Sequence, residues 1–139
     1  MKLITFISAG AFILSSAFIM KNESTAQALS LYDKKWELKK IHFADGVEVV
    51  TGKAFIRFNK EKKSAGGNGG CNLFGSTLTV SGNTVSFKDV FSTKMYCDGI
   101  QQTEDAFFKQ LEKADRFEIK NKALLLYNDK KLLLEFESE

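Results

Sequence analysis

A single amphipathic segment, residues 103–114, interrupts a chain that otherwise consists of short runs typical of β-strands. Thr103 stands where a helix N-cap is expected, and Glu104 and Asp105 follow in the first turn, where acidic side chains are favourable. The apolar side chains recur at helical spacing and form one stripe: Phe107, Phe108, Leu111 and Ala114. We therefore predict one helix of about three turns, packed through this stripe against a sheet.

The predicted strands lie on both sides of this helix. They occupy residues 35–43, 47–50, 53–59, 76–80 and 84–87 before it, and residues 116–120, 123–128 and 131–137 after it. The pair 76–80 and 84–87 flanks a Gly-Asn turn, which predicts a hairpin. Two leucine triplets, 124–126 and 132–134, break the alternation of a half-exposed strand and predict strands covered on both faces. Many short strands with one helix predict an α+β domain.

The first 28 residues have the three parts of a secretory signal peptide. A basic N-terminus precedes an apolar region over residues 3–20, and small residues at the end of the following polar stretch predict cleavage after Ala28. An uncleaved anchor helix is the alternative, although an apolar region of this length is only at the edge of what spans a bilayer. No cysteine precedes Cys71, so the lipid-carrying cysteine of a lipoprotein signal is absent. We expect an exported protein, periplasmic or extracellular, with no lipid anchor and no membrane span after cleavage, formed by one domain over residues 29–139.

The distribution of charge argues against nucleic acid as a partner. The chain carries 20 Lys and Arg residues against 17 Asp and Glu, and its lysine pairs are scattered among acids and form no basic block. Nucleic-acid binding requires a concentrated positive surface. We therefore expect no nucleic-acid partner.

Cys71 and Cys97 are the only cysteines of the chain. In an exported domain an even number of cysteines first indicates a disulfide, and two free buried thiols are the alternative. Structural zinc needs four Cys or His ligands, usually in close pairs, whereas the chain adds only His42. His42 and Cys71 would form a base–nucleophile pair only if the fold brought them together, and the spacing does not indicate it. We expect no metal, no cofactor and no catalysis.

The stretch KKSAGGNGGCNLFG, residues 62–75, is rich in glycine. A phosphate-binding loop would need a Lys and a Ser or Thr after its last glycine and then a helix, whereas here a strand-like run follows. The dinucleotide-binding fingerprint fails on its glycine spacing and its missing helix. We predict a tight turn between two strands, in which Asn68 and Asn72 bond to their own turn backbone.

Three short motifs give the chain a resemblance to the META domain family, which includes the HslJ-like bacterial heat-shock proteins. WELKKI is similar to the opening of the family, GGCNLF to its Gly-Cys-Asn-x-aromatic core, and STKMYC to its Thr-x-Met-x-Cys core. The stretch EDAFFKQL also resembles the family's Glu-led helix, and the resemblance extends from Trp36 to Phe136. Its motif residues are Trp36, Gly70, Cys71, Asn72, Phe74, Thr93, Met95, Cys97 and Glu104.

The resemblance implies a small, strongly curved antiparallel β-sheet or open barrel, with one amphipathic helix packed on it. It implies no catalytic residue and no cofactor, and it associates the chain with the cell envelope, with the stress response and, in some members, with secretion or virulence. Two departures affect loop geometry. Ser76 stands where the family has a glycine, with Gly75 one residue early, and Asp98 stands where many members have proline.

Three classes of function fit these features. We expect first a non-catalytic protein of the cell envelope, a stress-linked interaction module that acts as a monomer on another exported protein. The alternative is a carrier of a lipid tail or other apolar ligand, because 13 phenylalanines and two leucine triplets on a curved sheet could leave a cavity beside the helix. A close-packed core is the simpler use of these side chains. An enzyme or a protease inhibitor comes third, because no reactive constellation is present.

Overall fold

The fold is that of a computed structural model, which describes residues 27, 28 and 30–139. Residues 1–26 of the predicted signal peptide, and residue 29 just after the predicted cleavage point, lie outside this description. Among the residues described, no helix combines the length and the apolar character needed to cross a membrane.

Within the described residues, nine strands form one antiparallel sheet, and the helix α2 (Gln101–Lys113) separates the sixth strand from the seventh. The strands are β1 (Trp36–Phe43), β2 (Gly46–Val49), β3 (Phe55–Asn59), β4 (Ser64–Asn68), β5 (Leu73–Ser81), β6 (Thr84–Ser92), β7 (Arg116–Lys120), β8 (Ala123–Asn128) and β9 (Lys131–Ser138). Their order in the sheet is β2-β1-β3-β4-β5-β6-β7-β8-β9.

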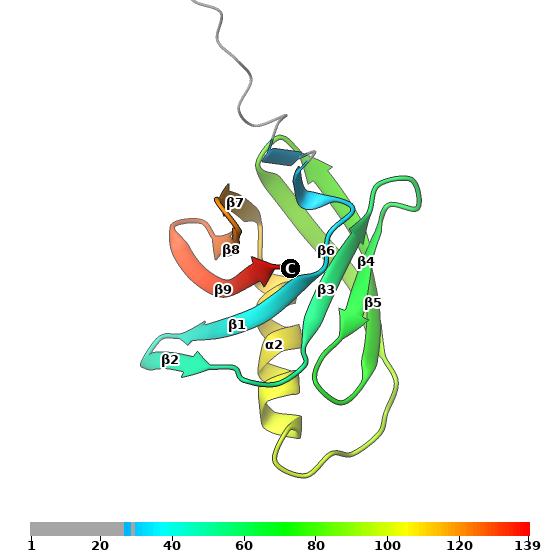
Figure 1. Cartoon of the computed structure of the whole chain (residues 1–139), viewed down its shortest axis with the longest axis vertical. Coiled ribbons are helices and arrows are strands. Elements are labelled where there is room, and N and C mark those ends of the chain that lie inside the picture. Colours follow the sequence, from blue (N-terminus) through cyan, green and yellow to red (C-terminus); the bar gives the residue numbers. More distant parts are fainter. Residues whose placement is uncertain (1–26, 29) are drawn as a thin grey trace, which may run out of the picture.

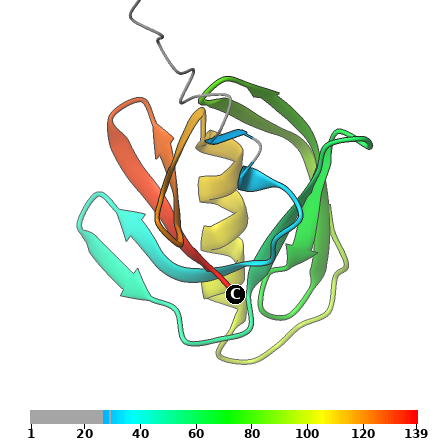
Figure 2. The same cartoon turned by 45° about the horizontal axis from the view of Figure 1, so that its top comes forward.

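Strand β1 curls this sheet on itself, because it pairs with β3 and also with β9. The opposite side is nearly open: β6 and β7 meet through the single pair Thr84–Arg116, where the chain leaves the sheet to form α2. Helix α2 lies in the hollow, with β3–β6 on one side and β1, β2 and β7–β9 on the other (Figures 1 and 2). The predicted α+β class and the strongly curved antiparallel sheet with one helix are confirmed.

The core fills the space between the sheet and the helix. Phe107 on α2 is fully buried and packs its ring against Phe74 of β5 and Phe136 of β9, with ring centroids 5.4 and 5.9 Å apart. A register shift between Leu38 and Lys40 turns Ile41 of β1 inward in place of a lysine, as a β-bulge does. The largest fully buried side chains are Leu31, Trp36, Leu38, Ile41, Ile56, Phe107, Leu111, Phe117, Leu124, Leu126, Leu134 and Phe136.

The glycine-rich stretch is not only a turn, which corrects the prediction. Ser64–Asn68 forms strand β4 and pairs with both β3 and β5. A Cβ on Gly66 would lie 2.7 Å from the Phe74 carbonyl oxygen, and one on Gly67 would collide with that of Phe55. These glycines let three backbones approach closely inside the sheet, a role that strand glycines often have.

Two further predictions were wrong in detail. Helix α2 begins two residues before Thr103, and its N-cap is Ile100, which makes no side-chain capping bond. Thr103 instead donates its hydroxyl to Glu48 Oε1 of β2, at 2.6 Å. The leucine triplets are not covered on both faces, because β8 alternates regularly and Leu125 is only half-buried. In β9 a register shift places Leu133 beside Leu134 in the core, so the broken pattern marks a bulge.

Candidate functional site

A disulfide joins Cys71, just before β5, to Cys97 in the loop between β6 and α2. The two Cα atoms are 5.9 Å apart, in the normal range for a disulfide. The predicted disulfide is confirmed, and the alternative of two free thiols is wrong. The bridge fastens the long β6–α2 loop to the start of β5.

Glu104, in the first turn of α2, reaches this bridge with a carboxylate that is almost wholly buried, at 1% exposure of the residue. Its Oε2 accepts the backbone N–H groups of Cys71 at 2.9 Å and Asn72 at 2.6 Å, and its Oε1 accepts Asn72 Nδ2 at 2.6 Å. All three partners are donors, so the carboxylate acts purely as an acceptor. These hydrogen bonds tie the helix to the bridge.

The Asn72 side chain also forms hydrogen bonds to the β6–α2 loop. Its Oδ1 accepts the Met95 backbone N–H at 2.7 Å and the Thr93 hydroxyl at 2.9 Å, while its Nδ2 donates to the Met95 carbonyl at 3.0 Å. The Asn72 amide therefore holds both backbone groups of Met95, as a neighbouring strand would. The prediction that Asn72 bonds to its own turn backbone was wrong, whereas Asn68 does so, since its Oδ1 accepts the Gly70 N–H at 2.7 Å.

We call Cys71, Asn72, Thr93, Met95, Cys97 and Glu104 the clasp. The structure brings together six of the nine predicted motif residues in it. Gly70 lies beside it with a positive φ of 119°, a conformation that favours glycine, and a Cβ there would lie 3.0 Å from Ile100. The other two motif residues belong to the core: Phe74 packs on the helix, and Trp36 donates its indole N–H to the Leu31 carbonyl at 2.9 Å.

The chemistry of the clasp is that of a structural clamp. Its sulfurs are bonded to each other, and its carboxylate and amide are occupied by neighbours. His42 lies elsewhere, with Nε2 2.6 Å from Glu135 Oε2, so the fold does not pair it with Cys71. Among the described residues, no group of three or more His, Cys, Asp or Glu side chains could hold a metal ion.

Four large apolar side chains on the segments that the clasp joins, β5, β6 and the β6–α2 loop, are exposed, a feature that sequence reasoning missed. Leu73 is 60% exposed, Phe91 70%, Met95 57% and Tyr96 78%. We call them the apolar rim. Thr93 lies between them in the chain and donates its backbone N–H to the Leu73 carbonyl at 3.0 Å, which links the β5 and loop parts of the rim. Their scattered positions give no periodic signal, so the exposure followed only from the fold.

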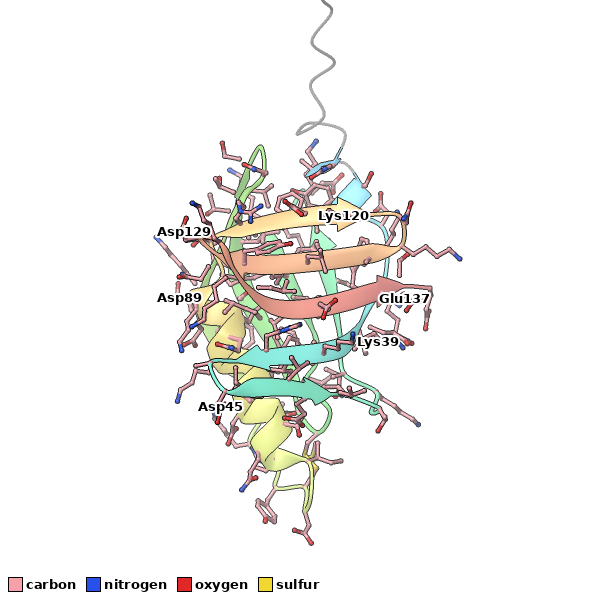
Figure 3. The ribbon with its side chains drawn as sticks, turned by 90° about the vertical axis from the view of Figure 1, so that its left-hand side faces the viewer. Lys39, Asp45, Asp89, Lys120, Asp129 and Glu137 are labelled. Atoms are coloured by element: carbon pink, nitrogen blue, oxygen red, sulfur yellow. A yellow bond between two sulfur atoms is a disulfide. The ribbon has the colours of Figure 1, made fainter. Side chains whose placement is uncertain are left out.

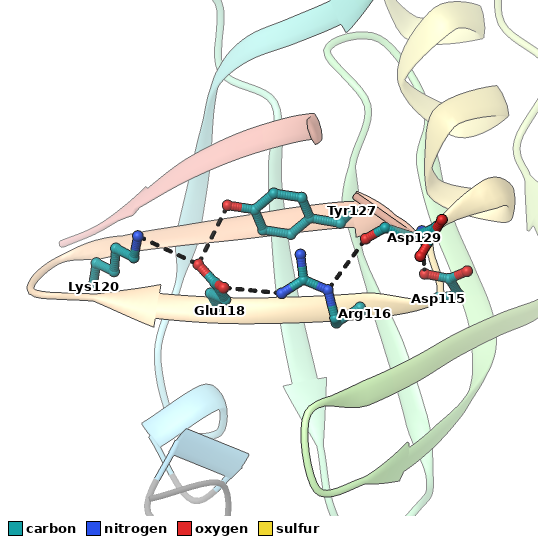
Figure 4. A network of polar contacts seen from close by, with 6 residues as sticks. All are labelled: Asp115, Arg116, Glu118, Lys120, Tyr127 and Asp129. Carbon is teal, nitrogen blue, oxygen red and sulfur yellow. Dashed lines mark hydrogen bonds and ion pairs between the residues drawn. The ribbon is translucent and has the colours of Figure 1, made fainter. Parts of the chain in front are cut away.

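A second polar network lies on the outer surface of β7 and β8 (Figure 4). Arg116 Nη1 is 2.9 Å from Glu118 Oε1, its guanidinium lies 4.1 Å from the ring centre of Tyr127, and Lys120 Nζ is 3.5 Å from Glu118 Oε2. The hydrogen bond from Arg116 is the main cause that lowers the pKa of Glu118, and Lys120 adds to it. Burial, followed by the negative charge of Glu118, raises the pKa of Tyr127.

Comparison with known proteins finds one matching family and several solved structures with a similar fold. A family model described as META domain matches residues 27–139. An NMR structure of a protein from Burkholderia xenovorans is 23% identical, with a TM-score of 0.69, and the match covers 84% of this chain and 88% of that one.

Two further solved structures share the fold. One, an NMR structure, is 17% identical with a TM-score of 0.59 over 78% of this chain and 92% of the other. A DUF4847 family protein from Bacteroides vulgatus is 16% identical with a TM-score of 0.50 over 77% and 93%. These low identities bear on the fold alone. No curated protein matches the chain.

Proposed function

The chain belongs to the META domain family, and from this premise we propose that it is a non-catalytic exported protein of the cell envelope that docks another exported protein through the apolar rim. One observation carries the proposal. Asn72 holds Met95 by both of its backbone groups, while the Met95 side chain stays 57% exposed. The clasp thus fixes a backbone whose apolar side chain points to solvent.

Physical chemistry favours docking as the use of such a surface. Isolated exposed apolar side chains are ordinary, but a group of them around one rigid element is typical of interaction sites. A surface that is already ordered loses little conformational entropy on binding. Tyr, Phe and Met are also enriched in the centres of protein interfaces.

Export and a role in stress are supported less directly. A disulfide persists in an oxidising compartment, which agrees with the signal peptide read from the sequence. The family resemblance supplies the link to the envelope and to stress. The filled clasp offers no free nucleophile, in keeping with a protein that binds and does not catalyse.

Photo-crosslinking in the native cells tests the docking surface. We would place p-benzoylphenylalanine at Tyr96 in one strain and at Lys122, an exposed turn residue of the β7–β8 hairpin, in another. We expect a crosslinked adduct of one discrete mass from position 96 alone, and its loss when Met95→Asp is added. Equal adducts from both positions, or an adduct indifferent to Met95→Asp, would contradict the proposal.

Intact mass spectrometry of the protein from the same cells tests export separately. A chain that begins at Leu29 and weighs two hydrogens less than its reduced form is the expected result. A full-length mass with free thiols would contradict export, whatever the crosslinking shows.

A further inference from the structure

A pocket of about 670 Å³ opens between α2 and the strands β1 and β9, away from the clasp. Figure 3 shows the face of the sheet where the β1–β2 turn, marked by Asp45, and the β8–β9 turn, marked by Asp129, lie alongside the helix. The side chains that concern its chemistry are Phe43, Ala106, Lys109, Lys113, Lys131 and Leu133.

The pocket has an apolar floor. Phe43, at the end of β1, is 39% exposed, whereas Leu133 of β9 is almost fully buried beneath the opening. Gln110 of α2 is 7% exposed and donates its side-chain amide to the His42 carbonyl, which joins the helix to β1 at this wall. This buried bridge makes the pocket a formed feature of the fold.

Three lysines surround the opening of the pocket. Lys109 and Lys113 lie one turn apart on α2, and Lys131 begins β9. None of the three ammonium groups forms an ion pair with any residue that the structure describes. Like charges one turn apart on a helix repel each other, so an anion bound between these lysines would relieve that repulsion.

Of the residues that line the pocket, one is acidic. Asp105 lines it, and its Oδ1 accepts the Gln101 side-chain amide at 3.0 Å. Glu135, on the neighbouring part of β9, is engaged by His42. Three lysines therefore face one lining carboxylate, an arrangement that the scattered lysines of the sequence did not predict.

We propose that this pocket binds an amphiphilic anion, with its charged head between Lys109, Lys113 and Lys131 and its apolar part on Phe43 and Leu133. The charge selects the sign of the ligand, and the apolar floor distinguishes a carboxylate, phosphate or sulfate with a tail from the free ion. The site lies apart from the apolar rim, so it stands or falls independently of protein docking.

Titration of the folded domain, followed by amide chemical shifts, tests the site. The probes are octanoate, octyltrimethylammonium with the same tail and opposite charge, and inorganic phosphate as a head alone. We expect octanoate to bind and to shift amides at the end of β1, in α2 and at the start of β9. Octyltrimethylammonium and phosphate should bind at least about tenfold more weakly, because each offers only one of the two complementary features.

Two charge variants sharpen the test. In Lys109→Gln/Lys113→Gln/Lys131→Gln the octanoate affinity should fall about tenfold and lose its dependence on salt. In the matched control Lys62→Gln/Lys88→Gln/Lys122→Gln, three exposed lysines elsewhere, it should not change. Equal loss in both variants, equal binding of the two tailed probes, or binding of phosphate as tight as that of octanoate would overturn the proposal. Because all six substitutions are on the surface, thermal unfolding should show both variants folded.

Discussion

The clasp and the β7–β8 network each gather several donors around one glutamate, yet they differ in depth. Glu104 is 1% exposed and accepts three N–H groups, two of them from backbone. The Glu118 side chain is 30% exposed and meets Arg116, Lys120 and Tyr127 at the surface. In the clasp no water can replace a lost partner, whereas on β7–β8 water takes its place at once. The burial of each glutamate, more than its number of contacts, should therefore decide how much its loss lowers the free energy of unfolding.

Glu104→Gln should give the largest effect in this comparison. The side-chain NH₂ of the glutamine would face the N–H donors of Cys71 and Asn72, which a carboxylate accepts. We expect the free energy of unfolding to fall by about 3 to 5 kcal/mol, as when one partner of a buried charged group is lost. Urea unfolding measures it. The matched control is Glu112→Gln, an exposed glutamate on the same helix, which should change stability by less than about 0.5 kcal/mol. Similar losses in both variants would show that the clasp has no special weight.

Removal of the disulfide should come next. Cys71→Ala/Cys97→Ala frees a loop of sequence separation 26, and we expect a loss of roughly 2 to 4 kcal/mol. Thermal unfolding with and without a reductant checks it, because reduction of the natural protein should reproduce the loss and leave the variant unchanged. If Glu104→Gln adds its full effect in the cysteine-free background, the bridge and the carboxylate act independently and the clasp is not one unit.

Glu118→Gln should have a much smaller effect. The pairs with Arg116 and Lys120 lie at the surface, where the Glu118 side chain is 30% exposed, and surface pairs contribute less than about 1 kcal/mol. Urea unfolding at low and high salt measures both the loss and its screening. A loss as large as that of Glu104→Gln would contradict the argument from depth.

The smallest predicted effect is a pH dependence carried by the same residue. The folded pKa of Glu118 lies below its ordinary value of 4.5, chiefly because of Arg116. The carboxylate therefore stabilises the fold above that pH, and its contribution disappears as the pH falls through the folded pKa. The difference in unfolding free energy between the natural protein and Glu118→Gln should be largest near neutral pH. It should shrink toward zero as the pH falls below 4.5 and through the folded pKa of Glu118. A difference that grows with acid would show the sign to be wrong.

The parts of the fold that depend on local pattern could be read from the sequence. The apolar stripe through Phe107 and Leu111 predicted the helix, and the Gly-Asn turn predicted the β5–β6 hairpin. The disulfide followed from the compartment that the N-terminus indicates. The helix and the hairpin each depend on a pattern within a few neighbouring residues. The disulfide prediction depended only on the redox chemistry of the expected compartment.

The site depended on contacts between distant residues, which no pattern contains. Asn72 was expected to cap its own turn but bonds to Met95 and Glu104, and Thr103 was expected to cap α2 but bonds to Glu48. A short polar side chain has both options in any sequence, and only tertiary packing selects one. The sequence also did not show that Lys109 and Lys113 of α2 lie at one pocket with Lys131 of β9, because these lysines come from separate segments of the chain.

The pairing of β1 with β9 has a consequence for the order of folding. Trp36 lies opposite Ser138 and Ile41 opposite Leu134, so the first strand finds this partner only in the last. A chain leaving the ribosome must be nearly complete before the sheet can close, and contacts so distant in sequence form slowly. The delay leaves a growing chain without a closed sheet for longer, which would suit the export proposed above.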